Sequence, residues 1–333
     1  MKAFRLRTRE AAQILERETL APGATLSEES VGRAIPEEPD LWRTAFERDK
    51  DRILHSKAFR RLKHKTQVFM NPEGDHFVTR MTHTLQVTQI GGAIARALSL
   101  NADLADAVCL GHDVGHSPFG HTGEDVLSDF VDGGWRHSDQ SVRIFESLEP
   151  LNLTWEVLDG IRAHSWRVEV PATTHEGNIV RFSDRIAYLA HDALDAIRAG
   201  VLDASQFPPD VLATFGEPGR EWVEVMVQSV IDESYRQNEI AMESDVLEAM
   251  HTLRDFMFER VYLRPEAEGE RRRARQIVRG LVEYFLEHPT EIPETYRHEE
   301  ADDLTQVIDY VAGMTDRYAI STHDSLFRPK LFE

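Results

Sequence analysis

The sequence predicts an all-α fold in which helices pack into a bundle. Apolar residues recur at helical spacing through most of the chain from Leu41 onward, with charged residues between them. Runs that could form strands are rare and short. Hydrophobic residues make up 41% of the 333 residues and charged residues 29%, which is typical of a globular protein.

The N-terminal part is expected to be irregular at first and then helical. Residues 21–40 (APGATLSEESVGRAIPEEPD) contain several prolines and glycines, so we expect an irregular arm. Residues 41–62 have the apolar spacing of a helix. In the next segment, TQVF at residues 66–69 is a candidate short strand and NPEG at residues 71–74 is a turn signal.

The rest of the chain is expected to be helical. One helix should run from about residue 78 to 98 and contains the adjacent glycines Gly91 and Gly92. Another should cover about 102–109, before a loop punctuated by glycine and proline. No clean domain boundary is visible, because the loops EPGR and RPEAEG are too short to be linkers. Further helices are predicted at 138–148, 154–163, 176–199, 219–236, 240–262, 270–287 and 301–319.

The charge and the cysteine content exclude several classes of protein. A net charge of −20 argues against nonspecific coating of nucleic acid, so binding a polyanion would require a metal or a local basic cluster. The single cysteine, Cys109, excludes a disulfide framework and a cysteine-rich zinc site. No stretch approaches the roughly 20 apolar residues that span a bilayer, and the N-terminus has no apolar signal region. We therefore expect a cytoplasmic protein without membrane contact.

A histidine and an aspartate continue the inward face of the predicted helix at 102–109. Leu104, Val108 and His112 are spaced i, i+4, i+8, and Asp113 follows Cys109 at the same spacing. Burying a carboxylate costs several kcal/mol unless it is paired or binds a metal. The His-Asp pair is therefore a candidate for metal binding, and the alternative is a helix-terminal pair in which Asp113 caps the next turn.

A second histidine begins an apolar stripe on the helix predicted at 78–98. His83 precedes Val87, Ile90, Ile94 and Ala97 along one face. A single histidine in this position is usually a core residue whose hydrogen bonds are satisfied. We therefore treat His83 as a candidate metal ligand only in combination with other ligand residues.

A third segment places two carboxylates on one helical face. Asp184, Tyr188 and Asp192 are spaced i, i+4, i+8 within the helix predicted at 176–199. The alternative is that these carboxylates lie on a solvent-exposed face of the helix.

Together the three segments supply two imidazoles and two carboxylates, which suit a divalent cation. Mn²⁺ is our first expectation, and Mg²⁺, Fe²⁺, Co²⁺, Ni²⁺ and Zn²⁺ are the alternatives. Such an ion would act as a Lewis acid on a phosphoryl group and could lower the pKa of a bound water.

The chain resembles the HD superfamily of metal-dependent phosphohydrolases, and within it most closely the dGTPase family of deoxynucleoside triphosphate triphosphohydrolases. The resemblance extends from about residue 43 to 320. It is carried by RDKDRILHSKAFRRLKHKTQVF, TRMTHTLQVTQIG, HDVGHSPFGHTGE, WRHSDQSVRIFE, SDRIAYLAHD and GMTDRYAI. It implies an HD-domain helical bundle with additional C-terminal helices, with an HD core at about 55–200 and a C-terminal helical part at about 201–333.

The resemblance also implies roles for individual residues. The family's metal ligands match His83, His112, Asp113 and Asp184. Its nucleophile-activating or proton-handling pair matches His121 and Glu124, and further histidines that contact phosphate or assist proton transfer match His116 and His137.

Residues that bind the substrate can be matched in the same way. Arg80, Arg185 and Arg254 correspond to cations that bind the triphosphate, and Gln67, Tyr188 and Asp192 correspond to residues around the sugar. Tyr262, in the less closely matched LRDFMFERVYL segment, would stack on the sugar or base. A Tyr188 packed against C2′ would leave no room for a ribonucleotide's 2′-hydroxyl.

The implied reaction converts a dNTP, such as dGTP, and water to a deoxynucleoside and inorganic triphosphate by attack at the α-phosphorus. The first alternative is another HD phosphohydrolase, either a nucleotidase or a hydrolase of cyclic nucleotides or alarmones. The second is a nucleotide-sensing or single-stranded-DNA-binding protein with residual catalysis, for which the basic runs RRLKHK (60–65) and RRRAR (271–275) are the supporting feature. The resemblance further implies a homo-oligomer, as a tetramer or hexamer, and makes a dNTP an expected candidate for an allosteric activator.

Overall fold

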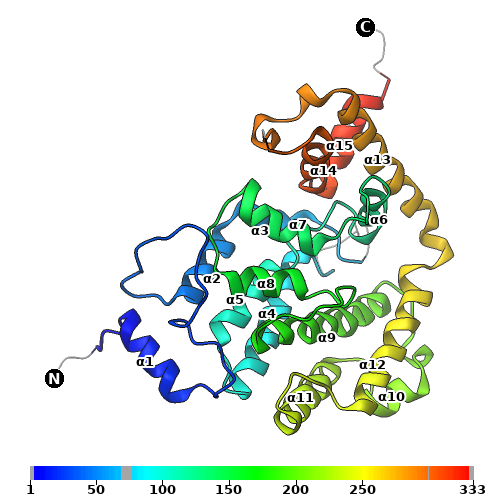
Figure 1. Cartoon of the computed structure of the whole chain (residues 1–333). Coiled ribbons are helices and arrows are strands. Elements are labelled where there is room, and N and C mark those ends of the chain that lie inside the picture. Colours follow the sequence, from blue (N-terminus) through cyan, green and yellow to red (C-terminus); the bar gives the residue numbers. More distant parts are fainter. Residues whose placement is uncertain (1–3, 69–76, 299, 330–333) are drawn as a thin grey trace.

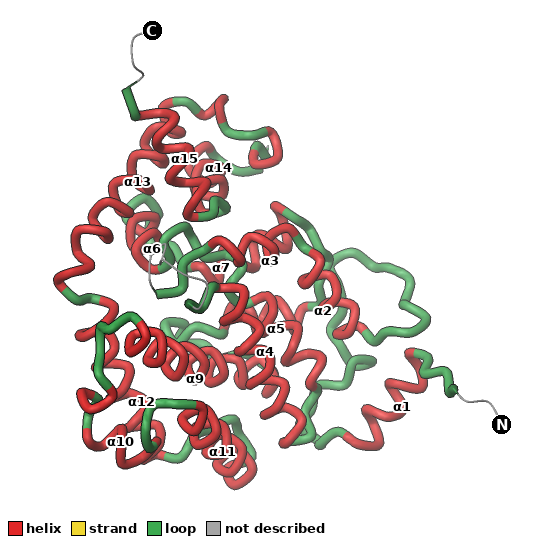
Figure 2. The backbone as a smooth tube through the Cα atoms, turned by 180° about the vertical axis from the view of Figure 1, so that it is seen from behind, coloured by secondary structure: helices red, strands yellow, loops and turns green. Residues whose placement is uncertain are grey.

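Helices form the regular structure of this protein. The computed structural model describes residues 4–68, 77–298 and 300–329, and within these ranges no strand is formed, which confirms the all-α prediction (Figures 1 and 2). The main helices are α1 (Arg9–Thr19), α2 (Ala45–His55), α3 (Lys57–Arg61), α4 (Arg80–Ala97), α5 (Ala102–Gly111), α6 (His121–Ser128), α7 (His137–Arg143), α8 (Trp155–Ala163), α9 (His175–Arg198), α10 (Pro209–Phe215), α11 (Arg220–Gln237), α12 (Ser244–Met257), α13 (Glu268–Glu287), α14 (Asp303–Ala312) and α15 (Asp316–Phe327).

The two glycines of α4 allow α4 and α5 to approach each other closely. A Cβ atom on Gly91 would lie 2.8 Å from Cys109 Sγ, and one on Gly92 would lie 2.6 Å from an oxygen of Asp106. Both distances are shorter than van der Waals contact, so a larger residue at Gly91 would displace the Cys109 thiol and one at Gly92 the Asp106 carboxylate. Glycine at both positions lets α5 pack closely along α4, the helix that carries His83.

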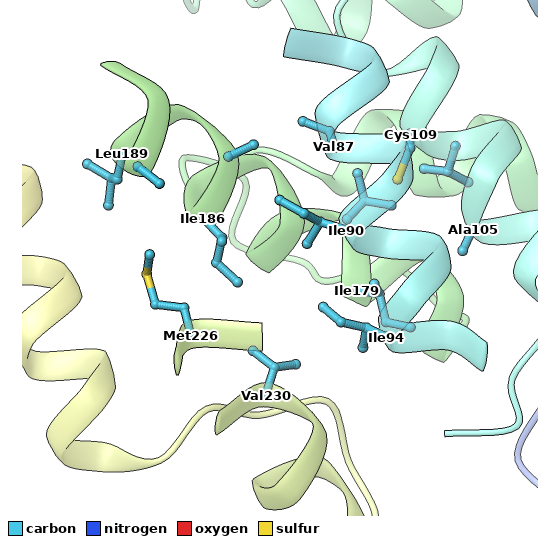
Figure 3. Close-up of a cluster of buried hydrophobic side chains, with 14 of the residues drawn as sticks. Val87, Ile90, Ile94, Ala105, Cys109, Ile179, Ile186, Leu189, Met226 and Val230 are labelled. Atoms are coloured by element: carbon cyan, nitrogen blue, oxygen red, sulfur yellow. The ribbon is translucent and has the colours of Figure 1, made fainter. Parts of the chain in front are cut away.

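A large hydrophobic core holds α4, α5 and α9 together. Buried residues from α4, α5, α9 and α11 meet in it, and Figure 3 shows Ile90, Cys109, Ile179 and Met226 among them. The apolar stripe predicted on α4 is buried at Val87, Ile90 and Ile94, whereas its last member, Ala97, is exposed. The first core therefore sets the distances among the three helices that carry the candidate ligands.

A second, smaller core lies at the C-terminal end of the molecule. It combines residues from 119–135 with residues from α13, α14 and α15. Helix α13 runs from the neighbourhood of α10 and α12 to α14 and α15, as Figure 1 shows. Residues 119–135, which lie between His116 and His137, therefore pack against the C-terminal helices α13, α14 and α15. The division into an HD core and a C-terminal part near residue 200 stays a prediction.

Several sequence-based boundaries need correction. The candidate strand at 66–69 is reduced, in its described part, to an isolated antiparallel bridge between Thr66 and Thr79. The helix predicted at 301–319 is two helices, because Thr315 accepts a hydrogen bond from Tyr318 N and starts α15 afresh. Helices α1, α6 and α10 were not predicted, and the NPEG turn at 71–74 lies outside the described residues.

Candidate metal centre and active site

Three helices bring the candidate metal ligands together. His83 lies in the first turn of α4, which Thr79 caps by accepting from Thr82 N. His112 follows directly after α5, and Asp184 lies in the middle of α9. One ligand atom from each of these three residues lies within 4.8 Å of the others.

The geometry of this cluster suits a cation. His83 Nε2 is 3.0 Å from Asp184 Oδ1, and His112 Nε2 is 3.8 Å from the same oxygen. The Nδ1 atom of His112 is 2.6 Å from the carbonyl oxygen of Cys109, which assigns the ring proton to Nδ1 and a lone pair to Nε2. That Nε2 is buried and has no hydrogen-bond partner among the described residues. A buried, unpartnered imidazole nitrogen beside a carboxylate is a ligand arrangement, so the residues fit a divalent metal.

The charges of Asp184 and His112 also suit a metal ligand. Although burial favours its neutral form, the hydrogen bond with His83 lowers the pKa of the Asp184 carboxyl, which therefore stays ionised. Burial lowers the pKa of His112. A neutral imidazole and an ionised carboxylate are the forms that bind metals.

Asp113, the fourth predicted ligand, lies beside the cluster and has other partners. Arg80 Nη1 donates to Asp113 Oδ2 at 2.7 Å, and His116 Nε2 is 3.1 Å from Asp113 Oδ1. Its Oδ1 is also 3.6 Å from His112 Nε2. Although burial opposes ionisation, His116 and Arg80 lower the pKa of Asp113 well below its usual range. Arg80, which we expected to bind phosphate, is buried and ion-paired with Asp113.

Glu124 organises a second cluster of histidines next to the first. Its carboxylate is 3.1 Å from His121 Nδ1 and 3.3 Å from His137 Nδ1. The rings of His137 and His116 stack with their centroids 3.8 Å apart. His121 is the most accessible of these residues, with 59% of its side chain exposed, whereas Glu124 is buried.

The hydrogen bonds also assign the protons of His137. His164 Nδ1 is 2.7 Å from the carbonyl oxygen of Ile161, so its Nε2 carries a lone pair, and that Nε2 is 3.2 Å from His137 Nε2. His137 therefore donates from both ring nitrogens. Although burial opposes the charged form, Glu124 raises the pKa of His137. His137 is thus held as an imidazolium between Glu124 and His164.

The predicted sugar residues lie around the next two turns of α9. Tyr262 donates to Asp192 Oδ2 at 2.9 Å, and burial raises the pKa of Asp192 to about 7 and that of Tyr188 to about 12. Tyr262 ends a π-helical turn (Phe258–Tyr262) that continues α12, and Arg271 donates to its carbonyl oxygen. Gln67 is partly buried, and its side-chain oxygen has no partner among the described residues.

The remaining predicted cations differ in their surroundings. The guanidinium of Arg185 lies 3.8 Å above the ring centroid of Trp166, and burial lowers the pKa of Arg185. Arg254 pairs with Asp255 and lines a surface cavity of about 1030 Å³, formed largely by the end of α12 and the residues up to 266. The residues that line this cavity do not include the metal-ligand candidates.

Two residues of this site, His164 and Trp166, were missed in the sequence. The signal for His164 was present, because Val157, Ile161 and His164 follow at i, i+4, i+7 and the first two are fully buried. The position of Trp166 over Arg185 is a tertiary contact with no local signature.

Comparison with known proteins agrees with this geometry. A model of the HD domain matches residues 80–189, and a model of the phosphohydrolase-associated domain matches residues 240–325. Part of the fold is shared with a crystal structure of a phosphohydrolase from Bacteroides thetaiotaomicron, with a TM-score of 0.51 and 20% identity over 84% of this chain and 68% of that one. No helix in the described ranges is long and apolar enough to cross a membrane.

Close relatives cover nearly the whole chain. A deoxyguanosinetriphosphate triphosphohydrolase-like protein of Caldanaerobacter subterraneus subsp. tengcongensis is 47% identical, with 97% of each chain covered. A protein of the same name from Clostridium perfringens is 44% identical, with 98% of this chain and 99% of that one covered. The chain therefore belongs to the deoxyguanosinetriphosphate triphosphohydrolase-like family of HD-domain phosphohydrolases.

Proposed function

We propose that this protein hydrolyses deoxynucleoside triphosphates, dGTP among them, to deoxynucleoside and inorganic triphosphate. The observation that carries the proposal is the buried Glu124 carboxylate, which holds two histidines beside the three-residue cluster of candidate ligands. Simple phosphatase chemistry would require only the metal cluster, whereas this arrangement adds a dedicated group for proton transfer. The names of the relatives support the same reaction.

The metal would be held by His83, His112 and Asp184, with Asp113 completing the set. When bound, it would supply positive charge that stabilises the phosphoryl oxygens in the transition state. Its identity, with Mn²⁺ expected first, belongs to the proposal.

His121 is the residue that we assign as the base. Its Nδ1–H donates to Glu124, so its Nε2 carries a lone pair and can accept a proton from the attacking water. A bond forms between the water oxygen and the α-phosphorus, and the bond from phosphorus to the 5′-oxygen breaks. The proton then passes to that 5′-oxygen, which leaves as the deoxynucleoside hydroxyl.

Arg185 is the best-placed cation for the triphosphate. It stacks on Trp166, and its buried Nε has no partner among the described residues. An anion would satisfy that nitrogen and offset the cost of burying the charge. Tyr188, which follows Arg185 on α9, would pack against C2′ of the sugar; replacing it with alanine should weaken discrimination against GTP.

Product analysis tests the proposal directly. The protein is incubated with each dNTP, singly and as a mixture, with Mn²⁺ or Mg²⁺, and the products are separated by ion-exchange chromatography. Inorganic triphosphate with deoxynucleoside is the expected result, and an EDTA-treated sample serves as the control. Pyrophosphate or single phosphate would refute the proposal in favour of another HD phosphohydrolase, such as a nucleotidase or a cyclic-nucleotide or alarmone hydrolase.

The nucleic-acid-binding alternative receives less support from the surface. In the run 271–275, Arg271, Arg273 and Arg275 are ion-paired with Glu268 or Glu270 of the same helix. In the run 60–65, Lys65 is buried, whereas Arg60 and Lys63 are exposed. Paired and buried cations contribute little to phosphate binding, so the two runs offer fewer cations to DNA than their sequences indicate, and single-stranded DNA is a weaker candidate partner than a dNTP.

The remaining expectations extend the proposal. We propose a cytoplasmic homo-oligomer, as a tetramer or hexamer, with a dNTP as a candidate activator. Activity that appears only with a mixture of dNTPs would support the activator, and sedimentation would give the oligomeric state.

A further inference from the structure

The loop that joins α5 to α6 carries His116 and delivers His121 to the site. Within it, Phe119 and Gly120 both have left-handed backbone conformations, with φ of +61° and +58°. A residue other than glycine in this region is uncommon and its conformation costs free energy, so the surrounding structure must hold Phe119 in place. These two residues immediately precede His121.

The holding contacts come from the C-terminal helices. The Phe119 side chain is buried in the second hydrophobic core, among residues of α13, α14 and α15. Its backbone N–H donates to Asp316 Oδ1 at 2.9 Å, and Asp316 is the first residue of α15. The loop is therefore anchored through both its side chain and its backbone.

Asp316 also binds Thr66, which belongs to a third segment of the chain. Its other oxygen accepts from Thr66 N at 2.9 Å and from the Thr66 hydroxyl. The neighbouring Lys65 donates to the carbonyl oxygen of His116 and, at 3.2 Å, to that of Ala312. The helix dipole at the start of α15 favours a carboxylate at this position.

We propose that Asp316 is a positioning residue for the reaction, which fixes the backbone before His121 and thereby the distance of that imidazole from the substrate. This inference rests on the proposed function. Asp316 touches neither the candidate ligands nor the histidines, so its effect on turnover would act through Phe119. A residue that only joined two parts of the fold would change stability and leave turnover by the folded protein unaltered.

The test compares Asp316→Asn with two control variants. The asparagine amide has one acceptor oxygen in place of two, so its NH2 group must face the N–H of either Phe119 or Thr66. One of these two hydrogen bonds is therefore lost. Thr315→Ala removes the cap of the same helix, and Asp309→Asn removes a buried carboxylate of α14 that binds Arg143 and Gln140. Neither Thr315 nor Asp309 forms a side-chain hydrogen bond with the loop at 114–120.

The expected result is a separation of kcat from KM. In Asp316→Asn, kcat for dGTP should fall by about 10- to 100-fold, because small misplacement of a catalytic group costs about this much. Its KM and bound Mn²⁺ should stay within about threefold of wild type. The controls should melt at lower temperature with kcat close to wild type. An unchanged kcat in Asp316→Asn, or an equal loss in both controls, would overturn the inference.

Amide hydrogen exchange gives a readout that does not depend on activity. The Phe119 amide should exchange slowly in the wild type and faster in Asp316→Asn, but not in Thr315→Ala once stability is accounted for. If the wild type releases no triphosphate, the proposed function fails and the catalytic role of Asp316 fails with it, whereas the exchange measurement still shows whether Asp316 holds the loop before His121. If Asp316→Asn does not fold, the wild type still decides it, because an unprotected Phe119 amide would refute the contact.

Discussion

The raised pKa of Asp192 predicts how the stability of this protein depends on pH. The side chain is 3% exposed, and its burial raises the pKa from 3.8 to about 7. Between these values the unfolded chain has lost the proton while the folded chain keeps it, so this carboxyl makes the protein less stable as pH rises from about 4 to 7. A difference of roughly 3 between the folded and unfolded pKa values of Asp192 corresponds to about 4 kcal/mol of stability.

Replacing Asp192 by asparagine should remove this penalty. The amide oxygen can still accept from Tyr262, and the side chain no longer ionises. The variant should match the wild type near pH 4 and become more stable at pH 8, with a melting temperature higher by about 8 °C at roughly 2 °C per kcal/mol. Thermal melts at several pH values in EDTA measure this difference without a contribution from metal.

A control on the same helix distinguishes this effect from a general response to losing a carboxylate. Asp195 accepts from Val78 N and pairs with Arg198, so Asp195→Asn should destabilise the protein at pH 8. A gap between Asp192→Asn and wild type that stays constant from pH 4 to 8, or a variant less stable at pH 8, would refute the reasoning.

The remaining predictions concern the metal, catalysis and packing. His112→Ala should lose most bound Mn²⁺ in elemental analysis, whereas His121→Ala should keep the metal and lose about 10²- to 10⁴-fold in kcat; metal retained with full activity in His112→Ala would mean that the ligand set is wrong. Gly115→Ala should yield little folded protein by circular dichroism, because the added Cβ would lie 2.3 Å from Ser141 N, a clash worth more than about 3 kcal/mol. Gly133→Ala, with nothing within 4 Å of its Cβ, should cost only the strain of its φ of +84°, about 1–2 kcal/mol, and equal losses in the two would contradict the packing argument.

The helices with strong apolar periodicity could be predicted from the sequence. The helix expected at 78–98 is α4 (Arg80–Ala97), and that expected at 176–199 is α9 (His175–Arg198), because a continuous buried stripe is a local property of the chain. The break between α14 and α15 is partly nonlocal. A Cβ on Gly313 would lie 2.7 Å from the hydroxyl of Tyr296, a contact that the sequence does not reveal.

The same distinction applies to the candidate site. The inward positions of His112 and Asp113 follow from their spacing after α5, and the structure confirms that both are buried. Which groups neutralise them does not follow from spacing, because Arg80 reaches Asp113 only through the packing of α4 on α5. The roles assigned to the individual residues stay predictions until the variants are measured.

The anchoring of the loop before His121 has a consequence for the order in which this chain matures during synthesis. The Phe119 contact with Asp316 spans 197 residues and the Thr66 contact spans 250. The first core, by contrast, draws its residues from 46–261. A ribosome-bound chain can therefore bury most of its first core before α15 has been made, and domains generally form in this N-terminal-first order. The candidate metal cluster can assemble at that stage, whereas the loop that precedes His121 has to wait for α15, the last helix in the described part of the chain. If the proposed function holds, an emerging chain would bind metal before it could hydrolyse a dNTP.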